Sequence, residues 1–272
     1  MDALRFRLRI FMVVFFGVML VGTFGFMYVE GLSLADAFYF SIVTITTVGY
    51  GDIHPATQPG KILAIILIIC GVGTFLGVVA NATEMLLNRR ETQIRMQKVH
   101  MVMGLFFSEI GTKLLRQFSG FDSQLDMIRN DLSVNGSWSG HEFSRVTKRL
   151  RAYEYTVDIH RGNLEELRVS LEGKSNFLLR LLENPILLEH ESFTELLRAV
   201  FHLREELLSR DDMKSLPDTD YSHLAGDIKR AYNLLVHQWL EYMQYLKDNY
   251  PYLFSLAVRT NPFNKEASPI VT

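Results

Sequence analysis

Residues 44–52 read Thr-Ile-Thr-Thr-Val-Gly-Tyr-Gly-Asp and lie between two long apolar runs, residues 10–29 and 62–87. The stretch is short and irregular, so regular helical bonds do not pair its backbone polar groups. At membrane depth such backbone is tolerated only where protein buries it or a water-filled cavity receives it. Gly49 and Gly51 permit left-handed backbone angles that residues with a Cβ resist. Alternating ordinary and left-handed residues turns successive carbonyls toward one axis, where a ring of them can replace the water shell of a cation.

The segment Thr47-Val48-Gly49-Tyr50-Gly51 resembles the selectivity filter of potassium channels. The order of apolar run, short helix, filter and second apolar run is similar to the two-transmembrane potassium channel family over residues 10–90. The resemblance implies an all-α membrane protein, with two transmembrane helices, a re-entrant pore helix and a filter, followed by a cytoplasmic helical domain. The alternative interpretation of the motif is a glycine-rich turn between two helices.

The resemblance also implies how the filter works. The carbonyls of Thr47, Val48, Gly49 and Tyr50, with the Thr47 hydroxyl, would coordinate K⁺, and Gly51 completes the motif. Non-selective relatives often lose the aromatic residue that Tyr50 retains here. One chain supplies one pore segment and a filter ring needs four, so a homotetramer is expected. Permeant K⁺ is then the expected ion, with no cofactor and no other metal.

A short helix is predicted over residues 34–46, with Ser33 as N-cap and Asp36 near its positive end. This helix is too short to span a membrane, so it is expected to re-enter and to point its partially negative C-terminus at the pore centre. By resemblance, Tyr39, Phe40 and Thr46 support the filter. Generic apolar packing is the alternative role for the aromatic residues.

Asp52 directly follows the filter and has two possible roles. It could hold the filter by a hydrogen bond, or its charge could raise the local cation concentration. Family members often carry an acid at the position of Val43, where this chain is apolar. The missing acid leaves filter rigidity and inactivation open.

Basic residues flank both apolar runs on the same side. Arg5, Arg7 and Arg9 lie in an N-terminal arm, residues 1–9, and Arg89 and Arg90 follow the second run. The positive-inside rule therefore predicts a multi-pass protein of the cell membrane, embedded in a lipid bilayer with both termini cytoplasmic. A cleaved signal peptide is the alternative for the first run. Its length of about 20 residues fits a membrane span better.

The second span carries Gly71 at the position of the family's hinge glycine, where the inner helix bends to open the gate. Packing against the filter assembly is the other explanation for this glycine. The face formed by Val72, Phe75 and Val79 is expected to line the cavity. Glu84 would form an acidic ring at the inner mouth, or a solvated helix end.

Residues 88–260 show helical patterns and neither the glycine turn of a Rossmann-type regulatory domain nor the alternating strands of a β-roll. Residues 261–272 are expected to be disordered. The role of the helical domain stays open between an assembly domain and a sensor that pulls the inner helices. The predicted helices, after an extension of the second span to residue 118, cover residues 122–132, 139–160, 163–184, 192–210 and 221–248.

Composition excludes several function classes. The net charge of −2 argues against a nucleic-acid binder, and no catalytic constellation suggests an enzyme. No arginine-rich helix precedes the pore, so strong voltage gating is not expected. The histidines of the helical domain are scattered in sequence and predict no metal site: His100, His141, His160, His190, His202, His223 and His237.

Three functions remain. The favoured one is a potassium-selective channel. A weakly selective cation channel shares the fold, but Tyr50 argues against it. A non-conducting membrane scaffold with a helical partner-binding domain would leave the intact filter motif unexplained.

Overall fold

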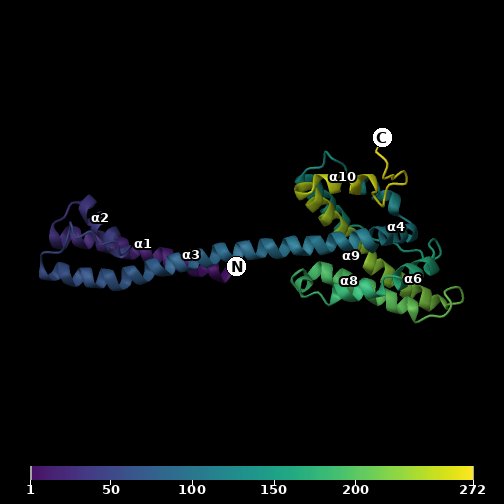
Figure 1. Cartoon of the computed structure of the whole chain (residues 1–272), viewed down its shortest axis with the longest axis horizontal. Helices are drawn as coiled ribbons and strands as arrows, with labels where there is room; N and C mark the ends of the chain where they lie inside the picture. The colour runs from purple at the N-terminus through teal and green to yellow at the C-terminus, as the bar shows by residue number, and fades with distance from the viewer. Residues whose placement is uncertain (1, 272) are drawn as a thin grey trace. The chain divides into compact units, whose positions relative to one another are not determined.

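The structure is a computed structural model that describes residues 2–271 (Figure 1). Within this range every regular element is a helix and no β-strand forms, apart from an isolated bridge between Asp122 and Val157. The chain divides into two units, Met1–Ile94 and Arg95–Thr272. The expected all-α fold class is confirmed. The division falls after residue 94 rather than after 87, because one helix continues through the predicted boundary.

The first unit contains α1 (Asp2–Glu30), α2 (Leu34–Ile45) and the first part of α3 (Gln58–Phe106). Two helical stretches, Ala3–Glu30 and Gln58–Phe121, are long and apolar enough to cross a membrane, and only 22% and 17% of their most apolar parts are buried within the chain. A core helix of a water-soluble protein would bury such surface. The exposure is that expected of helices that face lipid or neighbouring protein.

The basic arm is not a separate element. α1 begins at Asp2, so the residues predicted as an arm before the span are its first turns. The segment contains alanine, leucine and arginine and neither glycine nor proline, so nothing interrupts the helix.

The three helices of the first unit share a small apolar core. The rings of Phe26 in α1 and Phe40 in α2 meet edge to face, with centroids 4.6 Å apart, and Leu67 of α3 packs in the same cluster. A Cβ on Gly22 would lie 2.7 Å from Leu67 Cδ1, whereas Gly17 has no neighbour within 4 Å. The close approach of α1 and α3 therefore explains the glycine at position 22, but not the one at position 17.

The second unit packs shorter helices around the long helix α9 (Asp218–Asn249) (Figure 1). α3 leads into a π-helical turn, Phe107–Gly111, which replaces the uninterrupted extension predicted to residue 118. The Thr112 hydroxyl donates to the Phe107 carbonyl at 2.8 Å across this turn. The remaining α-helices are α4 (Thr112–Phe121), α5 (Gly140–Arg151), α6 (Leu164–Glu172), α7 (Ser175–Leu182), α8 (Glu191–Leu208) and α10 (Pro251–Arg259).

The spacing of apolar residues along the last long helix predicts a seam for helix packing. The structure confirms this seam, which forms the centre of the second unit's core. Its residues repeat at alternating spacings of four and three, which places them on one helix face. All are buried except the half-buried Tyr242: Ile228, Tyr232, Leu235, Trp239, Tyr242 and Leu246.

Three of the predicted helices are wrong in extent. Residues 122–132 form two 3₁₀ turns, Leu125–Met127 and Asn130–Leu132, rather than one helix. The helix predicted over 139–160 ends at Arg151, and the chain beyond it pairs with residue 122 through its isolated bridge. The helix predicted over 163–184 is interrupted at Gly173, because this flexible residue caps α6.

Residues 139–142 (Ser-Gly-His-Glu) and 192–195 (Ser-Phe-Thr-Glu) each have the sequence pattern that predicts a capping box, and the two predictions have different outcomes. Ser139 and Glu142 form the reciprocal capping box at the start of α5, as predicted. The box predicted from Ser192 does not form. α8 starts earlier, and the His190 ring accepts from the Phe193 N–H at 3.3 Å instead.

The prediction of disorder from residue 261 is wrong for the first part of the tail. Asn261 and Phe263 are 2% and 1% exposed. The Phe263 ring meets Trp239 edge to face at 5.1 Å, and the Asn261 amide donates to the Leu132 carbonyl at 2.8 Å. A polar composition suggests disorder, but one inserted aromatic ring and its flanking hydrogen bonds are enough to order the segment.

Replacing Phe263 by alanine should therefore destabilise the helical domain by about 3 kcal/mol, the usual cost of truncating a buried aromatic ring. Denaturant unfolding of the full chain in detergent measures this change. Both tryptophans, Trp138 and Trp239, lie in the second unit, so their fluorescence follows that unit. The matched control deletes residues 265–272, which are mostly exposed and should cost no more than about 0.5 kcal/mol. Equal effects of the two changes would contradict the packed tail.

Candidate functional site

The candidate site is the segment that follows α2. The Ser33 hydroxyl accepts from the Asp36 N–H at 3.1 Å, so the predicted N-cap is confirmed. α2 ends at Ile45, and both the N–H and the hydroxyl of Thr46 donate to the Ile42 carbonyl, at 2.9 and 2.7 Å. Thr46 therefore ties the start of the segment to the last turn of α2.

The backbone after α2 alternates between two conformations. Thr47, Gly49 and Gly51 have φ of 64°, 58° and 77°, and the two residues between them do not have positive φ. The left-handed angles expected at the two glycines are present, and a third falls on a β-branched threonine. Such an angle at threonine costs about 1 to 3 kcal/mol and persists only where surrounding structure imposes it. The alternation is the pattern that directs consecutive carbonyls to one side.

Hydrogen bonds hold one side of this segment and leave the other open. The N–H groups of Val48 and Gly49 both donate to the Val43 carbonyl, at 3.0 and 3.2 Å, and that of Thr47 donates to Thr44 at 3.1 Å. Within the described part of the chain, no hydrogen bond reaches the carbonyls of residues 47–50. These residues are also exposed in the single chain. Four consecutive carbonyls are thus available to an external ligand.

Asp52 is tied to the middle of α2. The Tyr39 hydroxyl donates to Asp52 Oδ2 at 2.8 Å. Of the two roles considered for Asp52, this geometry favours the hydrogen bond, because the bond anchors the C-terminal end of the segment to its supporting helix. Phe40 faces the other way, into the core against Phe26.

Gly71 of α3 lies directly against the end of α2. A Cβ at this position would come within 2.5 Å of Ile45 Cγ1, closer than any real contact. The observation supports the packing explanation for this glycine, since α3 runs through it without interruption. The hinge function stays a prediction.

The residues expected along the inner helix have different surroundings. Val72 is half-buried and Val79 is exposed, whereas the Phe75 ring lies 6.2 Å from that of Phe15 in α1. Phe75 thus contributes to packing between α1 and α3, which the cavity prediction did not include. Glu84 is exposed and lies 3.9 Å from Arg7, an ion pair of small energetic weight at this exposure.

Sequence reasoning missed the role of Glu30. Its carboxylate accepts from the N–H groups of Ala56 and Thr57 at 3.0 and 3.1 Å, and from the Thr57 hydroxyl at 2.6 Å. The Thr57 hydroxyl in turn accepts from the Gly60 N–H at 3.1 Å and caps α3. These bonds join the end of α1 to the start of α3. The sequence offers one weak signal for these bonds, an acidic residue at a helix end and a threonine 27 positions further along the chain.

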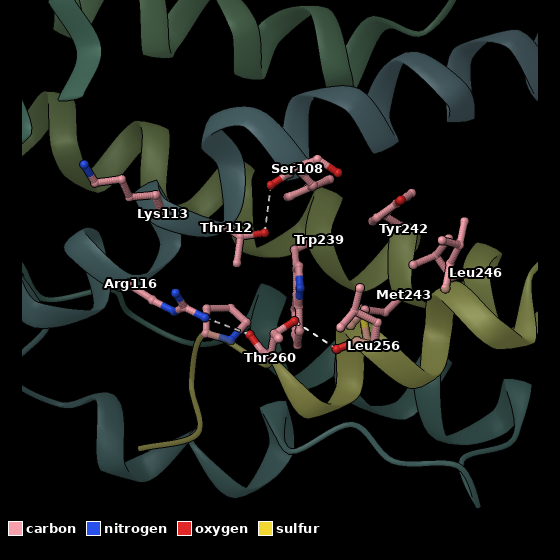
Figure 2. A pocket seen from close by; sticks show the side chains of 14 residues that line it. Ser108, Thr112, Lys113, Arg116, Trp239, Tyr242, Met243, Leu246, Leu256 and Thr260 are labelled. Atoms are coloured by element: carbon pink, nitrogen blue, oxygen red, sulfur yellow. Dashed lines mark hydrogen bonds between the residues drawn. The ribbon is translucent and has the colours of Figure 1, made fainter. Parts of the chain in front are cut away.

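The helical unit contains a separate cleft of about 410 Å³ beside the π-helical turn. Figure 2 shows the Trp239 ring in its middle, with Arg116 reaching Thr260. The Arg116 guanidinium donates to the Thr260 carbonyl at 3.1 Å. Since this cation is already engaged and the lining is mostly apolar, the cleft does not identify a ligand. Its walls come from the π-helical turn, α4, α9 and α10.

Comparisons with known proteins assign both parts of the chain. A family model described as "Ion channel" matches residues 13–88, and one described as "Uncharacterized protein MJ1433, C-terminal helical domain" matches residues 95–259. The chain is 42% identical to "Uncharacterized protein MJ1433" of Methanocaldococcus jannaschii over 80% of its own length and 82% of that protein. The chain belongs to the MJ1433 family. This chain therefore joins an ion-channel domain to a helical domain.

Named potassium channels are similar over shorter segments. "Potassium channel protein 1" of Methanocaldococcus jannaschii is 55% identical over 47 residues, which are 17% of this chain and 14% of that protein. "Two-pore potassium channel 4" of Arabidopsis thaliana is 68% identical over 37 residues, 14% of this chain and 13% of that protein. This MJ1433-family protein is therefore a membrane protein with an ion-channel domain of the potassium-channel type, and the resemblance drawn from its motif is confirmed.

Substituting Gly71 with alanine should destabilise the channel domain by about 1 to 3 kcal/mol, because the new methyl group overlaps Ile45. A double-mutant cycle with Ile45→Ala tests the cause, since removing Cγ1 removes the overlap. Thermal unfolding of the detergent-solubilised protein, followed by circular dichroism, should give a coupling energy of about 1 kcal/mol or more. Additive effects would show that Gly71 is constrained by something other than Ile45.

Proposed function

We propose that this protein is a potassium-selective channel, assembled from four copies, that conducts passively through a filter formed by residues 47–51. The carbonyls of Thr47, Val48, Gly49 and Tyr50, together with the Thr47 hydroxyl, would coordinate dehydrated K⁺. The observation that carries the proposal is the alternating backbone after α2, with positive φ at residues 47, 49 and 51. This backbone leaves four consecutive carbonyls without donors.

The proposed assembly of several copies follows from the number of oxygen ligands that a dehydrated cation needs. A single chain contributes one column of oxygens, and a cation that has lost its water shell needs oxygens on all sides. Symmetry around the column is the simplest way to supply them. The exposure of the apolar faces of α1 and α3 supports burial against neighbouring copies as well as lipid.

Selectivity for potassium over sodium rests on Tyr50 and its surroundings. The Tyr50 side chain is 73% exposed in the single chain, which leaves it available for contact with an adjacent copy. Such contacts would stiffen the ring of carbonyls. A weakly selective cation channel is the alternative. A non-conducting scaffold does not account for a strained threonine and unpaired carbonyls at this point.

We further propose that both termini are cytoplasmic and that gating occurs at the inner helices. The basic residues beside both spans support this orientation. One helix, α3, carries the second span and continues into the helical unit without a break. It offers a direct mechanical link if the helical unit is a sensor rather than an assembly domain.

Potassium flux into proteoliposomes tests the proposal through two matched glycine variants. Gly49 and Gly31 have left-handed φ of 58° and 68°, and neither has a neighbour within 4 Å of an added Cβ. Alanine therefore carries the same backbone penalty at both sites, about 1 to 2 kcal/mol. Gly49→Ala should lower the flux at least tenfold, because here the penalty falls on the backbone that would line the conduction path, and a rise of about 1.4 kcal/mol in the conduction barrier is a factor of ten.

Gly31→Ala changes the turn between α1 and α2 and should leave the flux close to that of the unmodified protein. Equal flux through the unmodified chain and Gly49→Ala would reject residues 47–51 as the conduction path. No flux through the unmodified chain, under conditions where a known potassium channel conducts, would favour the scaffold.

A further inference from the structure

Two helices of the second unit bring together a cluster of metal-ligating side chains far from the filter in sequence. α8 and α9 pack antiparallel, because residues 202, 206 and 210 face residues 227, 223 and 220 in reverse order. His202 and Glu206 lie one turn apart on α8, and His223 and Asp227 lie one turn apart on α9. His202 and His223 are separated in sequence, but the structure brings them close together.

The distances from Asp227 to the two histidines are close to those between ligands of a tetrahedral ion. Asp227 Oδ2 lies 3.3 Å from His223 Nε2 and 3.5 Å from His202 Nε2. The ligand atoms of these three residues all lie within 4.8 Å of one another. With metal–ligand bonds of about 2.0 to 2.1 Å, two ligands of tetrahedral zinc are separated by about 3.3 Å. The side chains thus need little movement to close on an ion.

The buried carboxylate gives an independent indication of a missing ligand. Asp227 is only 5% exposed, and its Oδ2 has no hydrogen-bond donor. Arg230 lies 3.5 Å from the other oxygen, Oδ1, and does not occupy this side. The two imidazole nitrogens lie near this oxygen without donating a hydrogen bond to it. A buried carboxylate oxygen without a hydrogen bond is costly, and coordination to a cation is one way to compensate it.

We propose that His202, His223 and Asp227 bind a divalent transition-metal ion of the zinc type, which clamps α8 to α9. Glu206 would supply the fourth ligand: its Oε2 lies 3.5 Å from His223 Nε2 and its Oε1 3.8 Å from His202 Nε2. In the structure, Oε2 also accepts from the Arg210 guanidinium at 2.9 Å. Two imidazole nitrogens with carboxylate oxygens suit zinc rather than calcium or magnesium, which prefer all-oxygen sites. The side chains of His202 and His223 are 47% and 52% exposed, which gives an ion a path of entry.

The test measures zinc binding to the full chain in detergent, purified with an affinity tag that contains no histidine. Elemental analysis after dialysis against zinc should find one zinc per chain. Competition with a fluorescent zinc chelator gives the dissociation constant. His202→Gln, His223→Gln and Asp227→Asn should each weaken zinc binding at least about tenfold. Mutation of residues that only hydrogen-bond to a metal ligand already lowers metal affinity by that much. Calcium and magnesium should not compete.

His141→Gln is the matched control, because this histidine is exposed on α5 and lies outside the cluster. It should bind zinc like the unmodified chain. Zinc should also raise the unfolding temperature of the unmodified chain and not that of Asp227→Asn. The unfolding temperatures of the variants without zinc show whether they fold. None of these readouts depends on ion flux.

Two results would overturn the proposal. One is equal zinc affinity in Asp227→Asn, the two histidine variants and the control. The other is no zinc retained by the unmodified chain at about 10 μM free zinc, a level at which structural sites are occupied. The cluster would then be a set of histidine–carboxylate ion pairs.

Discussion

The structure depends on one constraint, that unpaired backbone oxygens in a membrane need a partner. The N–H groups of residues 47–49 donate back to the end of α2, whereas the carbonyls of residues 47–50 accept no hydrogen bond within the described chain. In hydrocarbon each such group would cost several kcal/mol. In the proposed assembly, a cation in the centre of the ring would remove that cost and would give up its own water. The unpaired carbonyls that leave one chain incomplete would then be the ion's ligands.

The surrounding residues hold this segment from several directions. The carbonyl of Val43 receives two of its N–H groups, and Tyr39 anchors Asp52 at its far end. Gly71 lets α3 approach Ile45, the last residue of α2. Glu30 ties the end of α1 to the start of α3. These contacts lie within one chain, so the segment is positioned without contributions from the neighbouring copies of the proposed assembly.

The sequence predicted those features that depend on local chemistry. The cap at Ser33, the left-handed Gly49 and Gly51 and the seam of α9 follow from spacing and from residue type, and the structure has them. It could not predict contacts between distant residues. The clamp from Glu30 to Thr57 and the insertion of Phe263 against Trp239 depend on how helices meet in space. The same limit applies to His202 and His223, which are distant in sequence and which the antiparallel packing of α8 and α9 brings together.

The most direct test of the account is the reversal potential of the reconstituted protein in unequal potassium and sodium solutions. If dehydrated K⁺ binds the carbonyls of residues 47–50, the reversal potential will follow the potassium gradient and will not respond to an opposing sodium gradient. A reversal potential that shifts equally with either ion would contradict the account, because it would mean that the ions pass these oxygens without giving up their water.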